Sequence, residues 1–479
     1  MTKLQQFMVF INYFSLGLLV PVLNLILLER GANLETLPLL YAVYAITVFC
    51  FELPSGICAD LYGRKAVFMI SCGFNCLSFL FLVFANHFVW LLFALIFNGL
   101  GRAFSSGSLD ALIIDQAIVK HGEDILSKVT SRLSIMEGGG LAIGGIMGGV
   151  IASIFGTYQV NVIARIVFML ILGGLCWVFI KENIGERANA NQQEVIKEEF
   201  EVLQSEMASE KLRDVLVENV CEVNSDKTRE VLVENECEVV DEKLSEELKE
   251  IPSKVTREKL LKETKNIKRT PLMVHLREGM QVVLSKPNFS YLILGFFFVG
   301  FLINTVETYW QTTFLDITKT QNSTWVLGII SFLGFFAVTI GNVISQKIID
   351  KLNSHWWKIY HVCRILFGSC MIVFGMQQSI IGFILLYTGV YMILGASTVV
   401  ENTLINKMTP SHMRASVLSL NSFLMQVGTF CASLISSILI HKVHIMGIWI
   451  IAGVLLGGYG IVVAFATRKV RKKEIEVSI

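Results

Sequence analysis

Apolar residues in this chain gather in long, nearly uninterrupted runs, separated by short polar segments and by one long charged segment. Helical residues rise about 1.5 Å each, so about 20 of them cross a hydrocarbon core of roughly 30 Å. Twelve runs reach that length: 5–28, 37–60, 66–85, 88–118, 130–154, 158–181, 288–315, 325–349, 357–376, 380–405, 412–440 and 444–467. The pattern predicts an all-α membrane protein with twelve transmembrane helices.

Lysine and arginine occur mainly in alternate loops between these runs. The basic set of loops and the C-terminal tail carry Arg64, Lys65, Lys120, Lys128, Arg132, Lys351, Lys358, Lys407, Arg414, Arg468, Lys469, Arg471, Lys472 and Lys473. The other set carries only Arg30, Lys319 and Lys442. Cation-rich short loops face the cytosol, so we expect both termini to be cytosolic.

The longest polar segment divides the runs into two groups of six. We expect an N-terminal six-helix bundle over 1–182, a charged cytosolic linker over 183–270, and a C-terminal six-helix bundle with a basic tail over 288–479. Two bundles joined by a connector can rock about a central site.

The linker contains a duplication with a period of 16 residues. DVLVENVCEV at 214–223 returns as EVLVENECEV at 230–239. Dense charge and few aromatic residues predict disorder or loose helix in this segment. In 271–287, apolar residues recur at helical spacing, which predicts an amphipathic helix lying on the cytosolic membrane surface.

Composition supports the membrane assignment and excludes several other classes. Hydrophobic residues make up 53% of the chain and charged residues 16%, with a mean hydropathy of +0.61; a soluble protein of this size needs more charge on its surface. Eight of the ten cysteines lie in apolar runs and no Cys-x-x-Cys occurs, so we expect no metal site. No phosphate-binding loop or nucleophile elbow is present, which argues against an enzyme, and nothing indicates nucleic-acid binding.

The loop between the second and third runs carries a dense motif. Gly56, Asp60, Gly63, Arg64 and Lys65 follow the pattern G-x-x-x-D-x-x-G-R-K. Asp60 ends one span, glycine at 63 permits a reversing turn, and two cations begin the next span.

This motif closely resembles the signature of the major facilitator superfamily, and the resemblance covers both bundles. It implies secondary transport, with Asp60 and Arg64 in a charge network that holds the cytosolic side shut. Asp115, at a similar expected depth, is a further candidate for this gate. The alternative is that these charges only set the membrane topology.

The fourth run contains charges at membrane depth, where charge is costly and normally faces a cavity or a partner. Arg102, Ser106 and Asp110 are spaced by four and so share one helix face. The superfamily resemblance links an arginine in this helix with proton coupling in drug antiporters, and Arg102 occupies the corresponding place. A structural ion pair is the alternative.

The fifth run carries Glu137, a further proton-coupling candidate, followed by a glycine-rich stretch. Small residues at four-residue spacing allow two helices to approach closely. The stretch also resembles the antiporter signature G-x-x-x-G-P-x-x-G-G, with Gly where proline is usual. The residues of this motif are Gly140, Gly144, Gly145, Gly148 and Gly149.

Other polar residues lie inside the apolar runs. Glu307 is a proton-coupling candidate because burial favours the protonated form of a carboxyl group; a paired structural charge or a place near the outer interface are the alternatives. Glu52 is a second such candidate, whereas Glu401 is expected at a gate or loop contact. The candidates for a substrate cavity are Asn24, Tyr44, Asn304, Trp310, Gln311 and Gln426.

Together these features predict a monomeric secondary active transporter in the cell membrane that works by alternating access. Resemblance to drug-efflux members favours export of amphipathic compounds by proton antiport; proton-coupled uptake of a nutrient or anion is the alternative. A transport-inactive sensor or scaffold acting through the linker is a third possibility. The expected partners are a small-molecule substrate, protons and the lipid bilayer, with the proton gradient as energy source and no cofactor.

Overall fold

The structure is a computed structural model of the whole chain. It describes residues 2–105, 108–121, 125–180, 280, 283–284, 287–319, 324–351, 356–409 and 414–477. The chain divides into two units, one formed by Met1–Glu182 with Met273–Ile479 and the other by Asn183–Leu272. The second unit, which contains most of the expected linker, and nearly all of the expected amphipathic helix at 271–287 lie outside the described residues.

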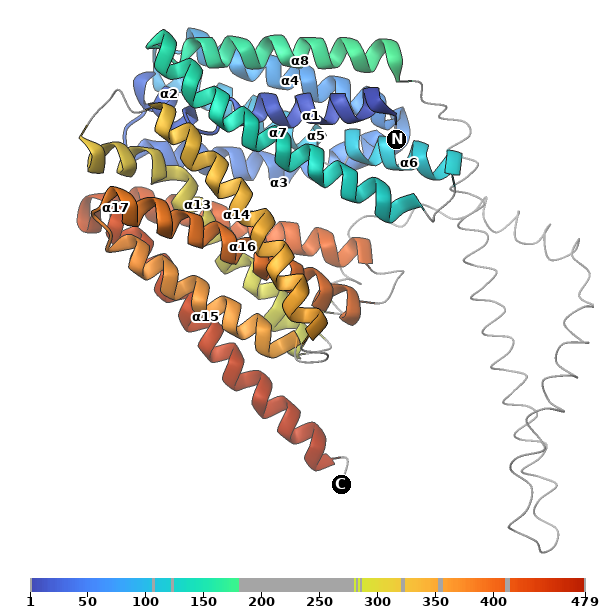
Figure 1. The fold of residues 1–479 in the computed structure, drawn as a ribbon, viewed down its shortest axis with the longest axis vertical. Helices are drawn as coiled ribbons and strands as arrows, with labels where there is room; N and C mark the ends of the chain where they lie inside the picture. Colours follow the sequence, from blue (N-terminus) through green and yellow to red (C-terminus); the bar gives the residue numbers. More distant parts are fainter. Residues whose placement is uncertain are drawn as a thin grey trace, which may run out of the picture. The chain divides into compact units, whose positions relative to one another are not determined.

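Every described element is a helix (Figure 1). The N-terminal half contains α1 (Lys3–Gly17), α2 (Leu23–Glu29), α3 (Thr36–Tyr62), α4 (Arg64–Phe84), α5 (Phe88–Ser105), α6 (Leu109–His121), α7 (Leu126–Phe155) and α8 (Gln159–Phe179). The C-terminal half contains α13 (Pro287–Thr318), α14 (Thr324–Lys351), α15 (Trp356–Gly375), α16 (Ile380–Met408) and α17 (Arg414–Val477).

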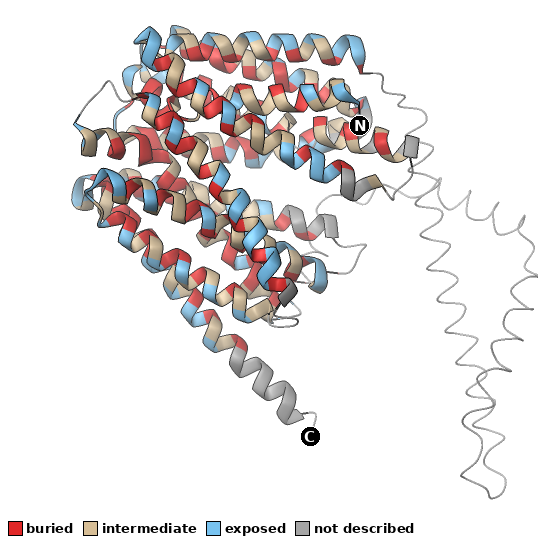
Figure 2. Ribbon diagram, in the orientation of Figure 1, coloured by how far each residue is buried: buried red, intermediate tan, exposed pale blue. Residues whose placement is uncertain are grey.

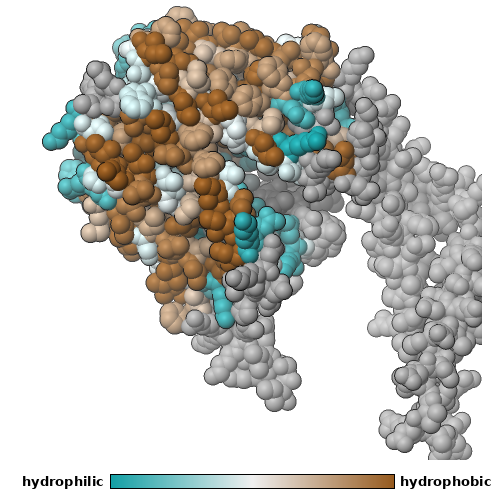
Figure 3. Space-filling view, in the orientation of Figure 1, coloured by the Kyte–Doolittle hydropathy of each residue, from teal (hydrophilic) through white to brown (hydrophobic). Residues whose placement is uncertain are grey.

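Nine helical stretches among the described residues are long and apolar enough to cross a membrane. Many large apolar side chains on these helices are exposed, including Phe84, Ile154 and Ile381 (Figure 2). Apolar residues also cover much of the visible surface of the helices (Figure 3). Such extensive apolar exposure fits a protein whose solvent is lipid. The predicted all-helical membrane fold is therefore confirmed at this level, whereas the twelve spans and their orientation remain predictions.

The first apolar run is not one helix, as 5–28 was expected to be. It is interrupted by turns at 18–22, where the backbone N–H groups of Leu19, Val20 and Val22 bond three residues back. Pro21 is the physical reason, because its ring removes an N–H donor and clashes with the carbonyl four residues earlier. The interruption leaves carbonyl groups free to bond elsewhere.

The fourth run, expected as one helix over 88–118, carries α5 and α6, and Phe88–Ile118 is one candidate membrane span. Ser108 donates its backbone N–H to the Ser105 carbonyl at 3.1 Å and its hydroxyl to the same carbonyl at 3.0 Å. Ser106, the middle residue of the expected four-residue pattern from Arg102 to Asp110, lies outside the described residues.

The last two runs, expected at 412–440 and 444–467, form the single element α17. His444 has non-helical backbone angles (φ 54°, ψ 176°) and divides it. The segment before His444 packs on α3 and α13, and the segment after it packs on α15.

The two halves meet where α7 packs on α14, α17 packs on α3, and α13 packs on α2 and α3. We call the end of the bundle at Gly63, where the cation-rich loops are expected, the basic end; the end at 30–35, 376–379 and His444 is the opposite end.

Candidate functional site

The motif between α3 and α4 forms a tight reversal at the basic end. Gly63 has φ +90°, a conformation that favours glycine, and it both ends α3 and begins α4. Lys65 donates to the backbone carbonyls of Trp177 at 2.9 Å and Ile180 at 2.6 Å, which satisfies the C-terminal end of α8.

Of the remaining residues of the expected gate, the structure describes the side chains of some only. Arg64 is the first residue of α4 and half-buried, and Gly56 is exposed on α3. Asp60 lies in α3 and Asp115 in α6, but their side chains lie outside the described part of the chain. The gate role of this motif stays a prediction.

Three of the expected proton-coupling residues gather around one tyrosine. The Tyr13 hydroxyl on α1 donates to Oδ2 of Asp110 on α6 at 3.0 Å. Glu137 on α7 and Arg102 on α5 lie within electrostatic range of the same hydroxyl. We call Tyr13, Arg102, Asp110 and Glu137 the Tyr13 cluster; it unites four helices of the N-terminal half.

Arg102 also connects this cluster with α3. Its side chain is exposed, and it lies within electrostatic range of Tyr44, as does Glu52. Glu52 is half-buried and interacts with at least one other residue. The N-terminal half thus presents three carboxyl groups and one guanidinium in neighbouring positions.

Asn24 on α2 joins the two halves. Its amide Nδ2 donates to the backbone carbonyl of Glu307 at 2.6 Å, to that of Thr308 at 3.1 Å, and to Oε1 of Gln311 at 2.8 Å. Its Oδ1 accepts the hydroxyl of Tyr41 on α3. One buried side chain therefore bonds α13 across the junction, and the break in the first apolar run places it there.

Gln311 completes this junction from the other side. Its Nε2 donates at 3.0 Å to the carbonyl of Val20, one of the groups released by the break at 18–22. The carboxylate of Glu307 accepts a hydrogen bond from the Tyr391 hydroxyl on α16. We call Asn24, Tyr41, Glu307, Gln311 and Tyr391 the Glu307 cluster.

An aromatic layer lies behind the Glu307 cluster in the C-terminal half. Tyr387 packs on Tyr391 with ring centroids 4.7 Å apart and on Trp310 at 5.1 Å. Phe374 and Trp449 stack at 4.5 Å in the same layer. The packing of Tyr387 on Tyr391 restrains the tyrosine that bonds Glu307.

The other expected cavity residues have different surroundings. The amide oxygen of Asn304 accepts from Ser433 at 3.1 Å inside the C-terminal half. Trp310 is fully buried, and its indole nitrogen is without a hydrogen-bond partner among the described residues. Gln426 is half-buried on α17.

The glycines of α7 form two faces. Along the first, the glycines would press any Cβ against the backbone of α1 or of the turn after it: a Cβ at Gly140 would lie 2.7 Å from the Phe10 carbonyl oxygen. This face consists of Gly140, Gly144 and Gly148. The predicted close helix packing is therefore confirmed, and it lies within the N-terminal half.

The second face of α7 crosses to the other half. A Cβ at Gly149 would lie 2.7 Å from the backbone nitrogen of Gly328 on α14, and one at Gly145 would lie 3.1 Å from Ser331 Cβ. Gly145, where the antiporter signature has proline, thus contributes to the contact between the halves.

A buried ion pair, absent from the sequence-based candidates, lies in the C-terminal half. Nη2 of Arg364 on α15 is 2.9 Å from Oε1 of Glu401 on α16, with side-chain exposures of 0% and 3%. The guanidinium also packs over the Tyr360 ring at 5.1 Å. Glu401, expected at a gate or loop contact, is instead an internal partner. The signal was available, because Arg364 lies inside the run 357–376.

Among the residues that the structure describes, no group of three or more histidine, cysteine, aspartate or glutamate side chains could hold a metal ion. The candidate site thus consists of the Tyr13 cluster within the N-terminal half and the Glu307 cluster, whose amides bond across the junction of the two halves.

Comparison with known proteins gives consistent results. The family model of the Major Facilitator Superfamily matches residues 7–399. An uncharacterised MFS-type transporter, YxaM of Bacillus subtilis (strain 168), is 26% identical over 195 residues, which are 40% of this chain and 47% of that protein. The aligned region thus spans about half the length of this relative.

Solved structures share the fold at low identity. A mutant form of the nucleoside transporter NupG has a TM-score of 0.64 and 12% identity, covering 97% of this chain and 98% of that one. A POT family transporter in complex with 5-aminolevulinic acid has a TM-score of 0.63 and 12% identity, covering 97% and 96%.

Proposed function

The chain belongs to the Major Facilitator Superfamily, and from this premise we propose that it exports a small amphipathic molecule in exchange for protons. It does so by alternating access across the cell membrane, with twelve spans and both termini in the cytosol. The resemblance of the α7 glycine stretch to the antiporter signature supports this direction.

The Glu307 cluster is the observation that supports coupling of proton binding to the conformational change. The carboxylate of Glu307 is bonded to Tyr391, while the backbone of the same residue is bonded to Asn24 of the other half. A proton can shift a conformational equilibrium only if it binds the two states with different affinity. Glu307 meets this condition because its carboxyl group is enclosed while the two halves are joined and is hydrated once the halves separate at this point.

The Tyr13 cluster supports a cationic substrate. Asp110 and Glu137 provide two carboxyl groups against the single guanidinium of Arg102, and Glu52 adds a third on the neighbouring helix. Tyr13 and Tyr44 lie beside these carboxyl groups, and aromatic rings attract cations. We therefore propose lipophilic cations as the preferred substrates.

Uptake of a polar solute is the second candidate. The structural neighbours include a nucleoside transporter and a POT family transporter with a bound amino acid derivative, and these are similar in fold alone.

Flux measurements in vesicles reconstituted with the purified protein test the proposal. With the interior acidic, we expect saturable accumulation of a lipophilic cation such as tetraphenylphosphonium in vesicles whose proteins have their cytosolic face outward. Dissipating the pH gradient should abolish this accumulation. Accumulation only with the opposite gradient would indicate symport, while gradient-independent leak would indicate a channel, and no flux of cationic, neutral or anionic probes would favour a scaffold.

A further inference from the structure

A groove on the surface of the C-terminal half lies apart from both clusters. It has a volume of about 490 Å³ and is lined by residues of three helices, α14, α15 and α16. α14 and α15 each pack on α16. The lining residues that the structure describes therefore all belong to one half.

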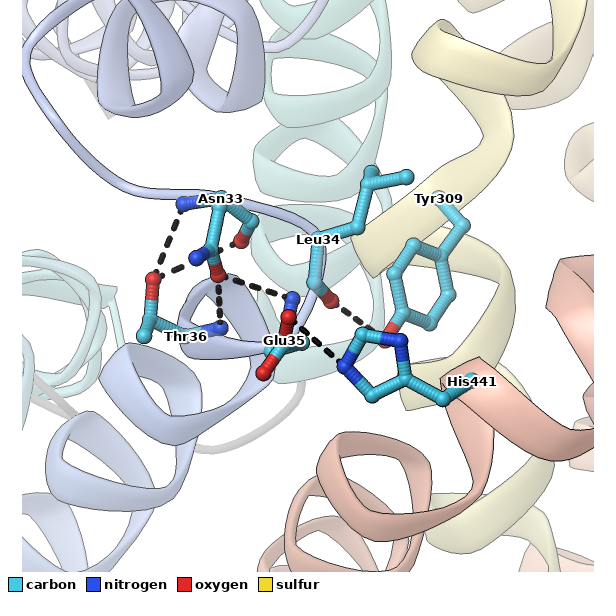
Figure 4. Close-up of polar contacts among 6 residues, drawn as sticks. All are labelled: Asn33, Leu34, Glu35, Thr36, Tyr309 and His441. Atoms are coloured by element: carbon cyan, nitrogen blue, oxygen red, sulfur yellow. Dashed lines mark hydrogen bonds and ion pairs between the residues drawn. The ribbon is translucent and has the colours of Figure 1, made fainter.

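This position separates the groove from the contacts that join the two halves at the opposite end. There Glu35, at the start of α3, pairs through Oε1 with Nε2 of His441 on α17 at 2.7 Å (Figure 4). The Tyr309 hydroxyl of α13 donates at 3.2 Å to the backbone carbonyl of Leu34 (Figure 4). Rocking of the halves breaks contacts of this kind, whereas a groove within one half keeps its lining. A molecule in the groove is thus compatible with every state of the protein.

Glycines bring α14 directly onto α16 beside the groove. A Cβ at Gly341 would collide with the carbonyl oxygen of Met392, and one at Gly395 would collide with that of Val338. The two backbones are therefore in contact at these points. Because Gly341 itself lines the groove and has no side chain, the space beside it stays open.

The lining changes character along the groove. Exposed apolar side chains line it from each helix: Ile344 from α14, Leu366 from α15 and Met392 from α16. Among the described lining residues, Lys358 is the one that carries a charge. Lys358 lies in the first turn of α15, which begins at the basic end, and Leu366 is about 12 Å further along this helix. The groove thus combines a cation at the membrane surface with an apolar length directed into the membrane.

We propose that this groove binds one anionic phospholipid, with the phosphate on Lys358 and an acyl chain along the apolar lining. A lysine ammonium donates strong hydrogen bonds to phosphate oxygens. The described lining contains no carboxylate that could balance the amine of a zwitterionic headgroup, so the groove prefers phosphatidylglycerol to phosphatidylcholine. The same lysine repels the lipophilic cations proposed as substrates, which makes the groove a separate site.

The bound lipid contacts the helix that contributes Tyr391 to the Glu307 cluster. Tyr391 bonds Glu307, and the next two residues of α16, Met392 and Ile393, line the groove. An acyl chain in the groove adds apolar contacts to three helices at once. We therefore expect phosphatidylglycerol to raise the thermal unfolding temperature of the delipidated protein.

Native mass spectrometry of the full-length chain in detergent counts bound lipids without any substrate flux, so a failed transport assay does not affect the result. Phosphatidylglycerol or phosphatidylcholine is added after removal of co-purified lipid. We expect one site that binds phosphatidylglycerol about five-fold more tightly, the preference that one lysine provides. Lys358→Gln should remove this preference. Ile344→Trp and Leu366→Trp, which fill the groove from two different helices, should each weaken binding of both lipids by roughly ten-fold.

The matched controls lie on α14. Lys347→Gln removes an exposed lysine and Val343→Trp adds an indole at an exposed position, and neither residue is among the described residues that line the groove. Both variants should bind lipid as the parent protein does, and every variant should unfold at the parent temperature in lipid-free detergent. The proposal is overturned if the parent protein shows no preference for phosphatidylglycerol, or if Lys347→Gln and Lys358→Gln weaken its binding equally. Displacement of the lipid by tetraphenylphosphonium would also overturn it, because the groove would then be a substrate site.

Discussion

At the scale of single residues, the junction between the halves depends on one side-chain amide. Asn24 uses its nitrogen on three acceptors of α13 and its oxygen on Tyr41. A buried polar group that loses its partners costs about 1–3 kcal/mol. Removal of this amide therefore weakens the joined state in particular, because the bonds exist only while the halves meet.

We expect Asn24→Ala to shift the protein toward separation at the opposite end, raising the ratio of open to closed molecules by about 5- to 150-fold, which corresponds to this cost. Distances between spin labels at Gln159 and Met376, exposed residues of different halves at the opposite end, measure the shift. Asn161→Ala is the matched control: Asn161 donates to the carbonyls of Leu18 and Gly148 within the N-terminal half, so its loss should lower thermal stability without favouring separation. Equal distance changes in both variants would contradict the role assigned to Asn24.

The buried Arg364–Glu401 pair gives a second prediction at this scale. Removing one partner leaves a charge buried without compensation, at a cost of about 3–5 kcal/mol. Arg364→Met should therefore lower the thermal unfolding temperature in detergent strongly, and Arg364→Met with Glu401→Leu should recover much of the loss. Lys358→Met, on the exposed face of the same helix, should have little effect. A double variant no more stable than the single one would refute an energetic coupling of the pair.

At the scale of helices, the apolar pattern predicted positions well and interruptions poorly. The bounds of α3, α4 and α8 lie within two residues of the runs 37–60, 66–85 and 158–181, because lipid requires long apolar helices. The break at 18–22 lies inside an apolar run, so hydropathy does not mark it. Pro21 was the available signal for this break.

The candidate site was predicted only in part, because a sequence shows which residues are charged but not which residues they contact. Charges at membrane depth are conspicuous in a sequence, and Arg102, Asp110 and Glu137 do gather around Tyr13. Tyrosines are ordinary in apolar runs, so the sequence could not show that Tyr13 bonds Asp110 or that Tyr391 bonds Glu307. Such pairings depend on how helices rotate against one another.

The glycine faces of α7 give a prediction at the helix scale. Gly144→Ala inserts a methyl group against the backbone of α1, so it should reduce thermal stability and membrane yield. Gly149→Ala inserts one against Gly328 of the other half, so it should favour separation at the opposite end instead. Gly139→Ala, where a Cβ meets nothing within 4 Å, is the control on the same helix. Similar effects at Gly139 and Gly144 would contradict the packing argument.

At the scale of the whole molecule, the two halves carry different parts of the proposed mechanism. The N-terminal half holds the Tyr13 cluster, the C-terminal half holds Glu307 with Tyr391 and the aromatic layer, and the bonds of Asn24 join the two halves. This division suits alternating access, since rocking of the halves breaks the bonds of Asn24 and leaves the Tyr13 cluster and the Glu307–Tyr391 bond within their own halves.

The central linker provides a prediction at the same scale. Because its composition predicts no packed core, deletion of residues 190–250 should leave membrane insertion and transport within about two-fold of the full-length protein. Transport by membrane vesicles containing equal amounts of each protein measures this. Loss of insertion would show that the segment folds and stabilises the bundles.

The most direct measurement of the central claim compares uphill transport with exchange in Glu307→Gln. A neutral amide keeps the size of the side chain and can still accept from Tyr391, but it cannot carry a proton. We predict that the variant loses gradient-driven accumulation of tetraphenylphosphonium in reconstituted vesicles, while exchange of labelled for unlabelled substrate without a gradient continues. Accumulation that still follows the pH gradient at the parent rate would contradict the account.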